Sequence, residues 1–158
     1  MKPASPKLTA ALQDLYFDER VAENQYLSHY ATVKNRGLTV FAAQLLERAG
    51  DERKHADRLA ERIAMFESAP LAYKGTIVPE TGREMVCDDM LTAEVEAEQI
   101  ARAKYEKAIM LCCEVGDNDT RDILVANLKD ETEHVHEIEV SQNLIELIGF
   151  ENWAQAML

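Results

Sequence analysis

The sequence is poor in the residues that build disulfide-bonded, collagen-like or membrane-spanning chains. Its 158 residues include six glycines, four prolines and three cysteines, and aromatic side chains make up 6%. The cysteines are Cys87 and the adjacent Cys112 and Cys113, and no Cys-x-x-Cys pair occurs, which argues against a disulfide framework. The residues near Met1 lack the apolar run of a signal peptide, and no apolar stretch is long enough to span a membrane. We therefore expect a protein of a reducing cytoplasm, with Cys112 and Cys113 packed in small apolar positions.

Positive charge is also scarce. Lysine and arginine number 17 against 29 aspartates and glutamates, so the formal net charge is −12. A chain this acidic does not neutralise phosphate groups, which argues against nucleic acid as a partner and offers no anchor to anionic lipid. The 29% of charged residues, with little glycine or proline, suits long helices better than sheets. The length predicts one domain, residues 1–158, with a substantial core.

Apolar residues recur with helical spacing over four long segments and one short one. The predicted helices cover about 8–34, 38–66, 84–114, 120–148 and 150–157. Asp119 or Thr120 is the predicted cap of the fourth helix. The stretch 67–84, which carries proline and glycine, is far longer than two adjacent antiparallel helices need. The sequence therefore predicts an all-α four-helix bundle in which this stretch crosses from one end to the other.

Three glutamates stand in rows that are otherwise apolar. They are Glu19, Glu52 and Glu131, each on a different predicted helix. Burying a lone carboxylate costs several kcal/mol unless a partner compensates its charge. Histidine follows two of these glutamates one helical turn later, as Glu52-x-x-His55 and Glu131-x-x-His134. Residues three apart share a helix face, so each pair could hold a metal ion.

A second Glu-x-x-His pair, Glu133 and His136, overlaps the pair Glu131 and His134. Its row also carries Lys129, Asp130 and Glu137 and is mostly charged, so we expect Glu133 and His136 at the surface. On the second predicted helix, Glu47 and Asp51 lie one turn apart on a face other than the metal face. For that pair a solvated face is the favoured interpretation over an iron site.

Spacing selects the fourth glutamate. Glu94 and Glu98 lie on nearly the same face of the third predicted helix, but Glu131 follows Glu98 by 33 residues, as Glu52 follows Glu19. Choosing Glu98 makes the chain a repeat of two helical hairpins. Face to face, the hairpins present four carboxylates and two imidazoles, the constellation of di-iron and di-manganese bundles. The alternative is that each buried Glu–His pair is only a polar contact within the core. Two such pairs at one depth favour a metal site over this alternative.

The sequence resembles the bacterioferritins over nearly its whole length. The resemblance rests on the segments DERVAENQYL, NRGL, DERKHADRLAERI, DDMLTAEVEAEQIA, RDILVANLKDETEHVHEIE and NLIELIGFENWAQAML. It implies a ferritin-like bundle with one long crossover between the second and third helices and a short fifth helix. The implied ferroxidase ligands are Glu19, Glu52, His55, Glu98, Glu131 and His134. Glu52 and Glu131 are then the bridges, and Tyr26 is the tyrosine beside the centre, either a one-electron donor or a core aromatic.

The resemblance also implies iron storage, with Fe(II) oxidised by O₂ or H₂O₂ and Fe(III) kept in a hollow shell of 24 subunits. Two iron ions per subunit are expected, and manganese or zinc can substitute because the ligands are oxygen and nitrogen. A ferredoxin-type electron donor is the expected partner for iron release. Haem-binding members carry a methionine directly after the second-helix glutamate, where this chain has Arg53, so we expect no haem in a homo-oligomer.

Three other functions stay open on sequence grounds. The first is a haem-free subunit in a mixed shell with a haem-binding sister chain. The second is a non-storage di-metal enzyme on the same bundle, of peroxidase or manganese catalase type. The third is a non-enzymatic bundle in which the Glu/His set is structural or filled with zinc. The size of the assembly in solution discriminates among these functions. A large shell supports storage, whereas a small dimer favours the non-storage enzyme or the non-enzymatic bundle.

Overall fold

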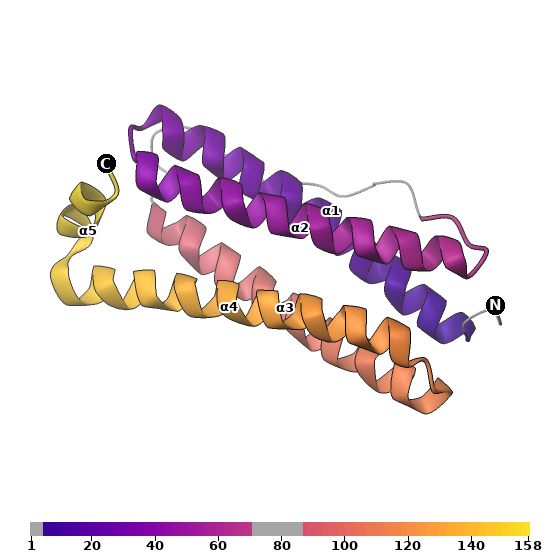
Figure 1. Ribbon diagram of the computed structural model, residues 1–158. Coiled ribbons are helices and arrows are strands. Elements are labelled where there is room, and N and C mark those ends of the chain that lie inside the picture. Colours follow the sequence, from indigo (N-terminus) through magenta and orange to yellow (C-terminus); the bar gives the residue numbers. More distant parts are fainter. Residues whose placement is uncertain (1–4, 71–86) are drawn as a thin grey trace.

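The computed structural model describes residues 5–70 and 87–158, which form five α-helices and no strand (Figure 1). The helices are α1 (Pro6–Asn35), α2 (Thr39–Met65), α3 (Cys87–Val115), α4 (Asn118–Ile148) and α5 (Phe150–Ala156). This architecture confirms the predicted all-α bundle with a short fifth helix. Among the described helices, none is both long and apolar enough to cross a membrane.

Local chemistry places the helix ends. Ser5 caps α1 by accepting a hydrogen bond from the Leu8 amide at 3.2 Å, with Pro6 in the first turn. Asp117 caps α4 by accepting from the Thr120 amide at 3.0 Å. The cap therefore lies two residues upstream of Asp119, so the predicted caps Asp119 and Thr120 were wrong. Gly149 stops α4 with φ of 83°, a conformation that glycine adopts without a steric penalty.

The helices pair into two hairpins, α1 with α2 and α3 with α4, which pack against each other along their lengths (Figure 1). The end of α2 and the start of α3 lie at opposite ends of the bundle, as the predicted crossover requires. Most of the predicted connection, 67–84, lies outside the described residues. Two apolar clusters fill the ends of the core: one contains Phe41 and Met90, the other Leu12 and Leu124. The six predicted ligands lie in the polar layer between them.

The fifth helix closes one end of the bundle by packing on the start of α2. The ring of Trp153 meets that of Phe41 edge-on, with centroids 5.2 Å apart. The Val40 amide donates to the Met157 carbonyl at 3.1 Å, and the Thr39 hydroxyl donates to the Leu158 carbonyl at 2.7 Å. These contacts tie the last residues of the chain to the first turn of α2.

Candidate metal centre

The structure brings all six predicted ligands together in the middle of the bundle. Each is at least 95% buried: Glu19, Glu52, His55, Glu98, Glu131 and His134. They form two overlapping groups whose ligand atoms lie within 4.8 Å of one another, and both groups contain Glu52 and Glu131. Glu19 and His55 complete the first group, whereas Glu98 and His134 complete the second. Each group therefore takes ligands from both hairpins.

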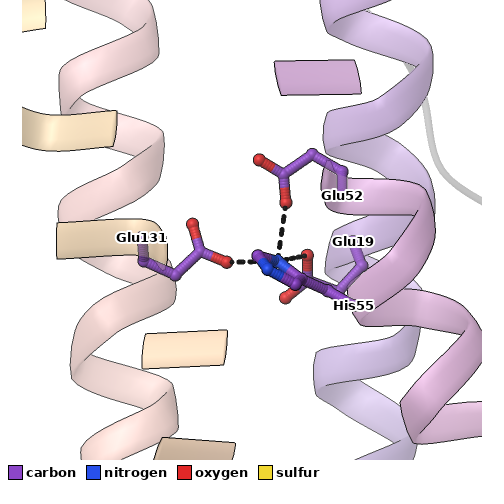
Figure 2. A group of neighbouring side chains, drawn as sticks. All are labelled: Glu19, Glu52, His55 and Glu131. Carbon is purple, nitrogen blue, oxygen red and sulfur yellow. Dashed lines mark ion pairs between the residues drawn. The ribbon is translucent and has the colours of Figure 1, made fainter. Parts of the chain in front are cut away.

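Around His55, three carboxylates converge on one ring nitrogen (Figure 2). Its Nδ1 lies 3.4 Å from Glu19 Oε2, 3.4 Å from Glu52 Oε2 and 3.0 Å from Glu131 Oε1. Figure 2 shows Glu131 reaching across from the α3–α4 side, opposite Glu19 and Glu52. Three helices, α1, α2 and α4, thus supply one compact set of oxygen and nitrogen donors.

The second histidine sees the other oxygens of the same two shared glutamates. His134 Nδ1 lies 3.3 Å from Glu52 Oε1, 3.5 Å from Glu98 Oε1 and 3.7 Å from Glu131 Oε2. Glu52 and Glu131 therefore each present one oxygen to the His55 group and the other to the His134 group. This division is what a carboxylate needs in order to bridge two metal ions.

Two buried tyrosines fix the outer glutamates of the two groups. The Tyr105 hydroxyl donates a hydrogen bond to Glu19, and the Tyr26 hydroxyl donates one to Glu98. The two tyrosines differ in one respect, because Asn127 Nδ2 donates to the Tyr105 oxygen at 3.0 Å. Glu19 and Glu98 are thereby held with one oxygen engaged.

The far nitrogen of each histidine faces an aspartate. His55 Nε2 lies 3.1 Å from Asp130 Oδ2, and His134 Nε2 lies 3.7 Å from Asp51 Oδ2. Carboxylates in this position orient a metal-ligating imidazole and fix which nitrogen carries the proton. Asp51 was expected on a solvated face and Asp130 in a mostly solvated row, and the structure adds to each a histidine contact that neither expectation included. Both side chains are partly exposed yet reach inward to a histidine.

Several atoms of the cluster are buried without any hydrogen-bond partner. They are Glu52 Oε1, both carboxylate oxygens of Glu131, and Nδ1 of His55 and of His134. Buried polar atoms left unsatisfied cost about 1–3 kcal/mol each. Because all of them face the centre of the cluster, a bound cation would satisfy them together. The donor set is four carboxylates and two imidazoles, which suits Fe(II) or Mn(II), and the four carboxylate charges balance two divalent ions.

The electrostatics of the cluster also call for added positive charge. Burial raises the pKa of the Glu131 carboxyl, Glu19 adds to the effect, and the result is about 8. Burial lowers the pKa of the His134 imidazole, but its contacts with Glu131, Glu52 and Glu98 outweigh this and raise it to about 12. Both shifts have one origin, the crowding of carboxylates in a buried layer. Protons and metal ions therefore compete for the same donors.

Glu94, the rejected candidate on α3, points to a different network. His29 Nδ1 lies 2.6 Å from Glu94 Oε1, and Arg48 Nη1 donates to Glu94 Oε2 at 3.4 Å. All three side chains are buried. Neither His29 nor Arg48 has a predicted role on sequence grounds. The predicted membership of Glu98 rather than Glu94 in the cluster agrees with the geometry.

Exposure tests two further sequence predictions, one for a charged pair on α4 and one for the adjacent cysteines. Glu133 and His136 are exposed, as expected from their charged row. Among the cysteines, Cys112 is buried and Cys113 is exposed. The packing role predicted for Cys112 therefore agrees with its burial, whereas the one predicted for Cys113 was wrong.

Comparison with known proteins agrees with this geometry. A family model described as a ferritin-like domain matches residues 9–148. A bacterioferritin from Brucella melitensis is 33% identical over 150 residues, covering 95% of this chain and 91% of the relative. A bacterial ferritin from Pseudomonas aeruginosa is 32% identical over 159 residues, covering 97% of both chains. A bacterial ferritin from Neisseria meningitidis serogroup B is 33% identical over 148 residues, covering 93% of this chain and 94% of the relative.

Proposed function

Because this chain belongs to the ferritin-like domain family and is of bacterioferritin type, we propose that it is an iron-storage protein with ferroxidase activity. Fe(II) is the substrate, O₂ or H₂O₂ is the oxidant, and Fe(III) is the product that is stored. The proposal places the oxidation at the cluster of Glu19, Glu52, His55, Glu98, Glu131 and His134, with two iron ions per subunit. Manganese and zinc are the expected substitutes.

One observation supports this reaction above the others. Glu52 and Glu131 each direct one oxygen to the His55 group and the other to the His134 group. Such carboxylates hold two ions side by side, so that two Fe(II) ions together deliver two electrons to one oxidant molecule. A cluster built for a single structural zinc ion would need only four donors around one point.

The surrounding residues exclude water along the bundle axis and hold the ligand side chains in place. Apolar clusters cover the ligand layer on both sides along the bundle axis. Tyr26 and Tyr105 hold Glu98 and Glu19 in place. The other oxygen of Glu19 faces His55, whereas Glu98 Oε1 both accepts from Tyr26 and faces His134. Asp130 and Asp51 orient the two imidazoles from outside. The protein thus supplies a preformed site. The negative charge of its carboxylates compensates the additional positive charge when Fe(II) becomes Fe(III).

Tyr26 is the better of the two tyrosines for a part in the reaction. It lines the cavity that opens between α1 and α3, whereas Tyr105 does not. Its oxygen also lacks the extra hydrogen bond that Asn127 donates to Tyr105. We therefore assign Tyr26 as a one-electron donor or hydrogen-bond partner beside the centre, and Tyr105 as a positioning residue.

Storage requires an assembly, because one bundle has no room for mineral. We expect a homo-oligomeric shell of 24 subunits in a bacterial cytoplasm, with α5 at a subunit contact and a ferredoxin-type donor for iron release. Arg53 is exposed on α2 and has no thioether to offer haem iron, so this homo-oligomer is expected to lack haem. A mixed shell with a haem-binding sister chain is the other assembly consistent with Arg53.

Anaerobic Fe(II) titration followed by oxidant tests the chemistry. The expected result is two Fe(II) bound per chain and fast oxidation, both lost in Glu131→Ala, while exposed Glu139→Ala on the same helix behaves like wild type. Equal behaviour of the two variants contradicts the assignment. Gel filtration tests storage: a shell elutes at roughly 430 kDa, 24 times the chain mass of 17.8 kDa. A stable dimer instead favours a non-storage di-metal enzyme.

A further inference from the structure

A cavity of about 390 Å³ lies between α1 and α3 and reaches the metal centre. At its inner end it is lined by four of the six cluster residues, Glu19, Glu52, Glu98 and Glu131. At its outer end it is lined by Asp18 and Lys104, whose side chains are 32% and 42% exposed. The cavity is therefore a path from solvent to the ligands.

The walls of this path are small and uncharged over most of their length. Alanines from both helices line it, namely Ala22, Ala93, Ala97 and Ala101. Glu94 also lines it, but His29 and Arg48 engage its two oxygens. A divalent cation that sheds its water in such surroundings suffers a large desolvation cost, whereas an uncharged molecule such as O₂ or H₂O₂ does not.

An ion pair spans the mouth of the cavity. Lys104 Nζ on α3 donates to Asp18 Oδ2 on α1, so the pair joins the two helices that form the walls. The lysine charge cancels that of Asp18, which would otherwise stand as a free carboxylate directly before the ligand Glu19. A cation approaching from this side therefore meets an ammonium group and no unpaired carboxylate.

Apart from the ligand glutamates, the carboxylates that line the α1–α3 cavity are Asp18 and Glu94, and both are paired. The opposite face of the bundle instead keeps an excess of acid. A groove of about 840 Å³ between α2 and α4 reaches the ligand His134. Five acidic residues line it against three basic ones: Glu47, Asp51, Asp130, Glu133 and Glu137 against Arg48, Lys54 and Arg58. The excess of acid raises the local concentration of cations.

We propose that Lys104 determines which reactant uses which route. Its ion pair with Asp18 disfavours the entry of divalent cations into the α1–α3 cavity, so that the uncharged oxidant uses this cavity. Divalent cations then reach the site through the α2–α4 groove. This inference rests on the proposed function, since it concerns how the two reactants reach that site.

The test follows Co(II) binding without oxidant, by stopped-flow absorption at low ionic strength. Lys104→Met keeps most of the side-chain length but removes the charge. It is expected to bind Co(II) about three- to tenfold faster than wild type, with the gain lost at high salt and the final stoichiometry unchanged. Lys107→Met, which removes an exposed lysine one turn away on α3, is the control and is expected to match wild type. An unchanged or slower rate in Lys104→Met overturns the proposal.

A second variant tests the path itself. Ala101→Leu narrows the cavity with one added side chain. It is expected to slow the oxidation of preloaded Fe(II) by H₂O₂ severalfold while leaving the rate of Co(II) binding unchanged. If Co(II) binding slows in parallel, cations use this cavity and the proposal is wrong. Failure of wild type to bind Co(II) at all would contradict the proposed function instead, so the two failures are distinguishable.

Discussion

Tyr26 and Tyr105 occupy matching places on opposite sides of the ligand cluster, each donating a hydrogen bond to a glutamate on the other's helix. Their residue numbers differ by 79, as do those of Glu19 and Glu98. The match is incomplete, because only the Tyr105 oxygen accepts a further hydrogen bond, from Asn127 at 3.0 Å. Substitutions of the two tyrosines are therefore expected to affect different properties of the protein.

Tyr105→Phe is expected to lower the free energy of unfolding more than Tyr26→Phe does. The change at Tyr105 leaves the buried Asn127 amide without its acceptor, at a cost of about 1–3 kcal/mol. Tyr26→Phe removes only one hydrogen bond to Glu98 and is expected to act mainly on the rate of iron oxidation. Urea denaturation and stopped-flow oxidation measure the two effects. The reverse ranking in both assays would refute the division of roles.

Asp130→Ala is expected to weaken metal binding more than Asp51→Ala does. Asp130 lies 3.1 Å from His55 Nε2, whereas Asp51 lies 3.7 Å from His134 Nε2 and is also engaged by Lys54 at 2.6 Å. Loss of such an outer contact typically lowers metal affinity about 10- to 100-fold. Anaerobic Co(II) titration measures the change, with the exposed Asp122→Ala on α4 as the control. Equal affinities in Asp130→Ala and the control would show that His55 needs no outer support.

Arg48→Met is expected to destabilise the protein by about 3–5 kcal/mol, because it leaves the Glu94 carboxylate buried beside His29 alone. The double variant Arg48→Met with Glu94→Gln removes both charges and is expected to recover most of the loss. Lys54→Met, at a mostly exposed position on the same helix, is the control and is expected to cost little. Thermal or urea denaturation of the metal-free protein measures all three. A double variant as unstable as the single one would exclude charge pairing as the cause.

Asp117→Asn tests the charge at the start of α4. Burial raises the pKa of the Asp117 carboxyl, but hydrogen bonds from Thr120 and contact with Arg62 lower it more, so it ends below its ordinary 3.8. A carboxyl with a lowered pKa stabilises the fold above its unfolded pKa and loses that contribution as the pH falls through the folded value. Asparagine caps a helix about as well as aspartate, so the variant isolates the charge.

The expected loss at neutral pH in Asp117→Asn is about 1.5–3 kcal/mol, the range for a hydrogen bond to a charged group. The difference from wild type is expected to shrink below about pH 4 as Asp117 takes up a proton. Urea denaturation at a series of pH values measures this convergence. A difference that stays constant down to acid pH would show that the charge of Asp117 contributes nothing.

Helical periodicity was enough to predict five of the six cluster residues, because a glutamate inside an apolar row indicates burial and a histidine three residues later shares its face. The 33-residue spacing then separated Glu98 from Glu94, and the structure places Glu98 in the cluster. Arg48 escaped detection because its partner Glu94 is 46 residues away on another helix, and local spacing carries no sign of pairing between hairpins. His29 was missed for the same reason, since 65 residues separate it from Glu94.

The outer aspartates could have been found. Asp51 and Asp130 are related by the same 79-residue offset as His55 and His134, so the internal repeat contained their signal. They were overlooked because their row is mostly charged, and periodicity alone reads such a row as solvent-facing. The packing of neighbouring helices, which brings each short aspartate side chain close to a histidine on another helix, is visible only in three dimensions.

The sharing of Glu52 and Glu131 between the two ligand groups has a consequence for the nascent chain during translation. A ribosome releases α1 and α2, with three of the donors, well before the codon for Glu131 is translated. Until α4 has emerged and docked, the first hairpin has no partner to exclude water or to complete its group. Both groups therefore become complete only when α4 has docked, and a product truncated before α4 lacks Glu131 and His134 and completes neither.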